Sequence, residues 1–155
     1  IIRPVLVYGP GVKSNLLSLM KWVKKRLPLP LGGVDNKRSF VSITNLNSFI
    51  YICLTHPKAG NETFLVSDQT PISISKLIEK LSLFLNTSIP IFVPFPKFIL
   101  SALLLMIGKG EVATKLLKSL EVDIEKNSKL LGWQPVQSTE DGLKQMTEDF
   151  LINEQ

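Results

Sequence analysis

The residues best suited to bind an anion lie in one run, where a glycine turn leads to an arginine and then to a short apolar strand. Gly32 and Gly33 tolerate positive φ angles and let a ligand come close to the backbone. Arg38 follows them and precedes the alternating residues 40–43, which predict a strand. A guanidinium offers planar, paired donors to phosphate or carboxylate oxygens. This spacing favours phosphate binding, although an arginine beside a turn is also typical of an ordinary solvated surface.

Turn residues and apolar periodicity divide the chain into strands and helices. Short apolar runs bounded by turn residues predict strands at residues 2–8, 40–43 and 63–67. Helical periodicity predicts helices from Ser14, at residues 46–54, 73–85 and 126–131, and from Thr139 onward. Gly132 is expected to end the helix before it in the left-handed conformation. No internal repeat or linker divides residues 1–155, so we expect one domain.

Composition restricts the classes of function. The chain of 155 residues has a formal net charge of +5 and 45% hydrophobic residues, which suit one sizeable core and an anionic partner. Cys53 is its one cysteine and His56 its one histidine, so neither an internal disulfide nor a zinc cluster is expected. A reducing, cytoplasmic location fits this composition, and no export leader is recognised ahead of residues 2–8.

A non-catalytic function is the alternative: the chain would be a basic module that binds an anionic surface or a protein partner. Two features of the sequence keep this alternative open. Lys24, Lys25 and Arg26 crowd the end of the first predicted helix, where cations also complement the helix dipole. No aromatic side chains interleave with them, so nucleic-acid binding is not expected. Residues 98–107 are strongly apolar but only about half as long as a membrane span, which leaves burial or peripheral contact with lipid.

Three stretches, in order along the chain, resemble the substrate-binding half of nucleotide-sugar epimerases and dehydratases of the extended short-chain dehydrogenase/reductase family. Residues 3–11 (RPVLVYGPG) resemble the family's strand and turn beside the nicotinamide. Residues 38–46 (RSFVSITNL) resemble its R-D-Y/F-V-H/Y-V-x-D-L segment, and residues 130–135 (LLGWQP) resemble its L-G-W-x-P turn. Residues 121–123 look like the family's late strand, with Asp123 as cap of the helix after it.

The resemblance implies a fold and a reaction. The fold class would be α/β, a C-terminal fragment with the last Rossmann strand and helix and a small mixed α/β substrate-binding lobe. Residues 1–27 would pack on an N-terminal Rossmann domain that is missing from this chain. The intact enzyme, an NAD-dependent isomerase of polysaccharide biosynthesis, would oxidise C4 of a UDP-hexose or UDP-N-acetylhexosamine to a ketone and return the hydride to the opposite face. A dehydratase or reductase of the family is the alternative, and a homodimer is left open.

The resemblance also assigns site residues by their place in or beside the matched stretches. The cofactor contacts to NAD would be Tyr8, Gly9 and Pro10. The substrate contacts would be Asn15, Leu16, Leu29, Leu31 and Arg38. Arg38 would bind the diphosphate, and Asn15 and Leu16 at a helix start would bind the same anion. Backbone groups of Leu29 and Leu31 would flank the uracil.

The sequence departs from the family in places that matter for catalysis. It has no Gly-x-x-Gly-x-x-Gly phosphate loop and no Tyr-x-x-x-Lys pair, which carry dinucleotide binding and proton transfer in the family. The family's Arg and Asp upstream of the late strand are also absent, and Lys115 or Lys118 would supply a less directional cation to phosphate. We therefore expect no catalytic residue in this chain and no activity of the fragment alone.

Overall fold

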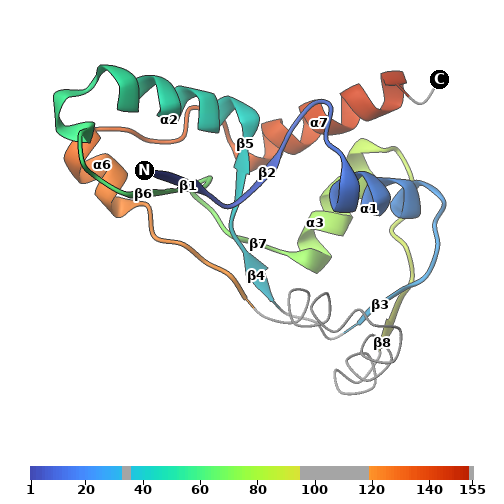
Figure 1. Ribbon diagram of the computed structural model, residues 1–155. Helices are drawn as coiled ribbons and strands as arrows, with labels where there is room; N and C mark the ends of the chain where they lie inside the picture. The colour runs from blue at the N-terminus through green and yellow to red at the C-terminus, as the bar shows by residue number, and fades with distance from the viewer. Residues whose placement is uncertain (33–35, 95–118, 154–155) are drawn as a thin grey trace.

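The computed structural model describes residues 1–32, 36–94 and 119–153, which form a mixed α/β structure (Figure 1). Its strands are β1 (Ile2–Pro4), β2 (Leu6–Tyr8), β3 (Leu29–Gly32), β4 (Lys37–Arg38), β5 (Phe40–Ser42), β6 (Phe64–Val66), β7 (Ile72–Ser73) and β8 (Phe92–Pro94). Its helices are α1 (Ser14–Lys24), α2 (Ile43–Thr55), the 3₁₀ helix η1 (Pro57–Ala59), α3 (Ile74–Phe84), α6 (Glu125–Leu131) and α7 (Thr139–Asn153). The predicted α/β class is confirmed.

The described strands form four two-stranded pairs, and the strands at the N-terminus of the chain take part in two of them. β1 pairs with β6 and β2 pairs with β5, both in parallel. Parallel strands need a crossover connection, and α2 supplies it between β5 and β6. The other pairs are β3 with β8 in parallel and β4 with β7 antiparallel. Residues 2–8 therefore hold together the two strands that α2 connects.

Two apolar cores hold these elements together. One lies among α1, α3 and α7, where Met20 and Met146 are fully buried. The other lies between α2, α6 and the β1–β6 pair and centres on Phe49. The ring centroid of Phe49 lies 5.6 Å from that of Phe64 and 4.8 Å from that of Trp133, both in edge contacts. These contacts fix α2 on one face of the parallel strands.

Helix α2 begins earlier than the sequence predicts. Ile43 is its first residue rather than the last residue of a strand, because the Ser42 side chain accepts a 3.1 Å hydrogen bond from the Asn45 amide and caps the helix. Ser73 caps α3 in the same way through the Lys76 amide. The other predicted helices and the strand at residues 63–67 are confirmed with small shifts at their ends. The strand predicted at residues 2–8 is two strands, β1 and β2, because the chain changes pairing partner at Val5, from β6 to β5.

The predicted strand at residues 121–123 is wrong. Beside β4 the structure has a single bridge, between Arg38 and Leu120, because β4 is only two residues long and offers few free backbone groups. The prediction that Asp123 caps α6 is confirmed with a shift of one residue. Ile124 occupies the N-cap position, and the Asp123 carboxylate before it accepts a 2.7 Å hydrogen bond from the amide of Glu125, the first residue of the helix.

Residues 1–27 pack within the described structure, through the strand pairs of β1 and β2 and through α1 against α3. Their packing on a further Rossmann domain stays a prediction. Among the described helices, none is both long and apolar enough to cross a membrane. The apolar residues 98–107 and the predicted phosphate contacts Lys115 and Lys118 lie outside the described residues.

Candidate functional site

A buried polar cluster lies where β2, β5 and β6 end, and we call Tyr8, Ser42, Asn45 and Asp68 the Asp68 cluster. The Asp68 carboxylate accepts hydrogen bonds from the Tyr8 hydroxyl at 2.7 Å, the Ser42 amide at 3.0 Å and the Asn45 side-chain amide at 2.7 Å. Each of the four residues is at most 2% exposed. A carboxylate removed from water is stable only with such donors, so the cluster holds the three strand ends close together.

Asn45 extends the cluster to the segment that precedes α7. Its side-chain oxygen accepts hydrogen bonds from the amides of Val136 and Gln137, each at 2.9 Å. Its side-chain NH₂ group also donates to the Gln137 carbonyl at 2.9 Å. The sequence singles out neither Asn45 nor Asp68 as a site residue. The one local signal is that Asp68 closely follows a short apolar strand and that Asn45 stands in the matched stretch 38–46.

Tyr8 is a neutral donor inside the core. Burial raises the pKa of its hydroxyl, and the neighbouring Asp68 carboxylate raises that pKa further. The hydroxyl also lies 3.2 Å from the Thr139 carbonyl oxygen. Gly142 of α7 leaves room for this side chain, because a Cβ at that position would lie 2.6 Å from the Tyr8 oxygen.

The raised pKa of Tyr8 predicts a loss of stability in alkali. The folded state holds the Tyr8 proton more tightly than the unfolded state, so this contribution is complete below pH about 10 and decreases by up to about 1.4 kcal/mol per pH unit above it. Tyr8→Phe should remove that part of the pH dependence, whereas Tyr51→Phe, at a 70% exposed position, should keep it. Urea unfolding at several pH values from 8 to about 11 measures the difference. Equal slopes for the two variants would contradict this prediction.

The predicted cofactor contacts Tyr8, Gly9 and Pro10 follow one another at the end of β2. Gly9 is explained without a cofactor, because its φ is +150° and an added Cβ would lie 2.7 Å from the Ile43 Cγ2 atom. The Tyr8 hydroxyl is bound inside the core, and Pro10 is exposed. Contact of these three residues with NAD stays a prediction.

Arg38 lies on a strand that is held on both edges. It pairs with Ile72 of β7, and the backbone beside it is joined to Leu120 by hydrogen bonds of 2.9 and 3.0 Å. The side chain is half-buried, and burial lowers the pKa of the guanidinium. An arginine so placed remains charged at neutral pH, and the fixed backbone limits the directions in which its donors point.

The other predicted substrate contacts lie on α1 and β3, at one end of the described structure, with β4 towards its middle (Figure 1). Asn15 is exposed in the first turn of α1, while the side chain of Leu16 is buried in the core. The side chain of Leu29 is also buried, and its amide donates to the Ile91 carbonyl at 3.0 Å. The backbone of Leu29 is thus part of the pairing of β3 with β8, and Leu31 lies in the same strand.

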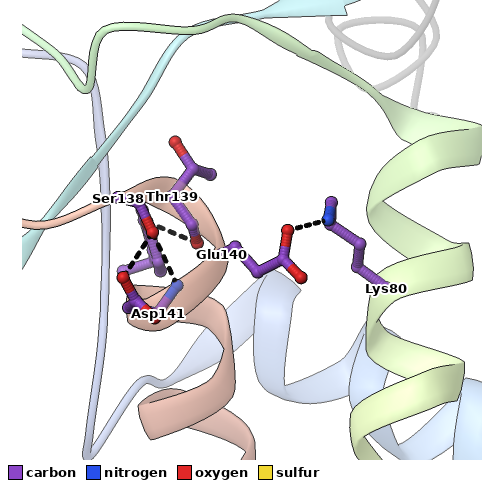
Figure 2. A network of polar contacts seen from close by, with 6 residues as sticks. Lys80, Ser138, Thr139, Glu140 and Asp141 are labelled. Atoms are coloured by element: carbon purple, nitrogen blue, oxygen red, sulfur yellow. Dashed lines mark hydrogen bonds and ion pairs between the residues drawn. The ribbon is translucent and has the colours of Figure 1, made fainter.

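A cavity of about 480 Å³ lies between the start of α3 and the start of α7. It is lined by residues 69–72, by Lys76 and Lys80, and by residues 135–140. Figure 2 shows Lys80 pointing to the Glu140 carboxylate, with which it forms an ion pair, and Ser138 beside Asp141. The Ser138 hydroxyl donates a 2.6 Å hydrogen bond to the Asp141 carboxylate. Among the residues that the structure describes, none of the predicted site residues lines this cavity. Among the described residues, no three His, Cys, Asp or Glu side chains gather to hold a metal ion.

The cavity nevertheless adjoins both predicted regions. Ile72, which lines it, is the strand partner of Arg38. Thr139, which also lines it, contacts the Tyr8 hydroxyl through its carbonyl oxygen. The candidate functional site is therefore the region from Arg38 across this cavity to the end of β2.

Comparison with known proteins identifies relatives of this chain and of its fold. No protein-family model matches the chain. Over 153 residues the chain is 42% identical to the UDP-glucose 4-epimerase of Vibrio cholerae. This alignment covers 97% of this chain and 46% of that protein. The chain is a partial-length homologue of nucleotide-sugar epimerases. It spans about half the length of this curated relative.

Solved structures share the fold of this epimerase homologue. The UDP-glucuronic acid 4-epimerase of Bacillus cereus, in complex with NAD, aligns with 100% of this chain and 45% of its own at a TM-score of 0.74 and 22% identity. The UDP-glucose 4-epimerase of Thermotoga maritima, with UDP-glucose, aligns with 99% of this chain and 46% of its own at a TM-score of 0.70 and 20% identity. Both confirm the predicted partial α/β fold.

Proposed function

We propose that this epimerase homologue is the substrate-binding portion of an NAD-dependent nucleotide-sugar epimerase, and that a UDP-hexose is its ligand. The observation that carries the proposal is the 42% identity to the Vibrio cholerae UDP-glucose 4-epimerase across 153 residues. The intact enzyme would catalyse 4-epimerisation in the cytoplasm, where the lone Cys53 stays reduced. A dehydratase or reductase of the same family is the alternative reaction.

Arg38 is the residue that we assign to the diphosphate of the ligand. Its strand is held on both edges, so the backbone that carries the guanidinium needs little ordering when the ligand binds. Half-burial also strengthens its attraction for a phosphate, because water screens the charge less. Asn15 at the start of α1 and the backbone of Leu31 complete the proposed contacts. They bind and orient the sugar nucleotide, and we assign no proton or hydride transfer to them.

The remaining predicted contacts would also bind the ligand without taking part in the chemical step. Leu16 and Leu29 would act only through backbone groups, since their side chains belong to the core. Lys115 and Lys118 would add positive charge for the phosphates. NAD supplies the hydride acceptor when it is bound in an intact epimerase, and residues outside this chain would hold most of it.

Calorimetric titration with UDP-glucose, with inorganic pyrophosphate and with heparin, each at several salt concentrations, tests the proposal. A shaped sugar-nucleotide site should bind UDP-glucose more tightly than inorganic pyrophosphate and retain this preference as salt rises. A basic module, the alternative suggested by the net charge of +5, should instead bind heparin with an affinity that falls steeply with salt. Heparin binding without measurable UDP-glucose binding would favour that module.

Arg38→Ala should raise the dissociation constant for UDP-glucose at least tenfold, a loss of about 1.4 kcal/mol, because a paired donor to the diphosphate is removed. The dissociation constant of Arg38→Lys should lie between the values for Arg38→Ala and for the unchanged chain. Lys37→Ala is the matched control, since Lys37 precedes Arg38 on β4 and is exposed. Calorimetry measures all three, and a change below twofold for Arg38→Ala would defeat the assignment.

A further inference from the structure

The cavity between the starts of α3 and α7 carries positive charge that its own lining does not neutralise. Its charged residues are Lys76 and Lys80 of α3 and Glu140 of α7. Glu140 forms an ion pair with Lys80, which joins the two helices beside the cavity (Figure 2). Lys76 is exposed, and within the described residues its ammonium group has no carboxylate partner. Both helices also begin here, and helix N-termini attract anions. The cavity therefore favours an anionic ligand.

The size and the walls of the cavity fit a molecule larger than a bare anion. Its volume of about 480 Å³ lies within the range of about 300–1,000 Å³ that is typical of small-molecule sites. Pro71, Ile72 and Pro135 make part of the wall apolar, whereas Gln69 and Thr70 present polar side chains. A sugar ring has the same combination, with C–H groups on its faces and hydroxyl groups around its edge.

Gln137 adds a hydrogen-bonding group that the fold leaves unsatisfied. It lines the cavity, and its side-chain oxygen is buried without a donor among the described residues. A buried acceptor without a partner is unfavourable, so a hydroxyl group of a bound molecule would stabilise this amide once the amide turns towards it. The backbone of Gln137 needs no ordering for this contact, because its amide and its carbonyl are both bonded to Asn45.

We propose that this cavity binds a phosphorylated sugar, with the phosphate at Lys76 and a sugar hydroxyl at Gln137. Lysine is a common ligand of phosphate, and the helix starts add to its attraction. The ligand would be additional to the UDP-hexose of the proposed function, since Arg38 and Asn15, which we assign to the UDP-hexose, lie outside the lining. The two sites adjoin, because Ile72 of the lining is the strand partner of Arg38.

Calorimetric titration with glucose 6-phosphate, with inorganic phosphate and with glucose tests the site. We expect glucose 6-phosphate to bind about fivefold more tightly than either of the others, because it alone can meet Lys76 and Gln137 together. Lys76→Ala should weaken its binding by about fivefold or more, since a hydrogen bond to a charged group is lost. Gln137→Ala should weaken it by about threefold.

Lys144→Ala is the matched control, because Lys144 is an exposed lysine of α7 outside the lining and should change the affinity by less than about twofold. Equal losses for Lys76→Ala and Lys144→Ala would overturn the proposal, as would equal affinities for glucose 6-phosphate and inorganic phosphate or no binding at millimolar concentration. A larger loss for Arg38→Ala than for Lys76→Ala would also overturn it, by assigning the sugar phosphate to the proposed substrate site. None of these titrations uses UDP-glucose, so a failure here is distinguishable from a failure of the proposed function.

Discussion

Asp68→Ala is expected to lower the free energy of unfolding by about 3–5 kcal/mol, the largest effect that we predict for a single substitution. The change removes the acceptor that the Ser42 amide and the Asn45 side-chain amide share in the interior, and it leaves the Tyr8 hydroxyl with its longer contact to the Thr139 carbonyl. Each buried donor without a partner costs about 1–3 kcal/mol. Since small proteins are stable by only about 5–15 kcal/mol, much of the chain would unfold under mild conditions.

Urea unfolding followed by circular dichroism measures the loss at Asp68. Asp68→Asn should cost less than the alanine change, because an amide oxygen still accepts from the Ser42 and Asn45 donors. Asp123→Ala is the matched control, an exposed aspartate with one hydrogen bond to a nearby backbone amide, and should cost less than about 1 kcal/mol. If Asp68→Ala destabilised the protein no more than Asp123→Ala, the Asp68 cluster would not hold the strand ends together.

Gly142→Ala is expected to destabilise the protein by about 2 kcal/mol, although the same change inside a helix ordinarily stabilises it by up to about 1 kcal/mol. The added Cβ would lie 2.6 Å from the Tyr8 oxygen and 3.0 Å from its Cε2 atom. Either α7 or the Tyr8 ring must then move, and the hydrogen bond to Asp68 is strained. The sign of the effect therefore reports whether Tyr8 packs under α7.

Two comparisons isolate the contact between Gly142 and Tyr8. Gly60→Ala is the control, because a Cβ there meets nothing within 4 Å and its backbone conformation is open to alanine, so stability should change by less than about 0.5 kcal/mol. Adding Tyr8→Phe to Gly142→Ala should recover part of the loss, since it removes the closest atom. Strictly additive losses in the double variant would show that the two residues do not interact.

The sequence by itself determined the local elements of this protein and its relationship to the epimerases. Apolar periodicity and the Ser73 cap predict α3, and Gly132, with a φ of 64°, ends α6 as its residue type suggests. These features depend on residues a few positions apart, so a short stretch of sequence contains the whole physical cause. The order of three matched stretches likewise predicts the α/β fold that the structural alignments confirm.

Only the tertiary structure decided what the side chains at the strand ends do. Tyr8 stands in a stretch that resembles a cofactor contact, yet its hydroxyl binds Asp68, 60 positions further along the chain. Asn45 binds the segment before α7 over a separation of 92 positions. The failed strand at residues 121–123 has the same origin, because its partner β4 is two residues long in the folded chain. Contacts between distant residues depend on how strands and helices pack, and no local period in the sequence records that packing.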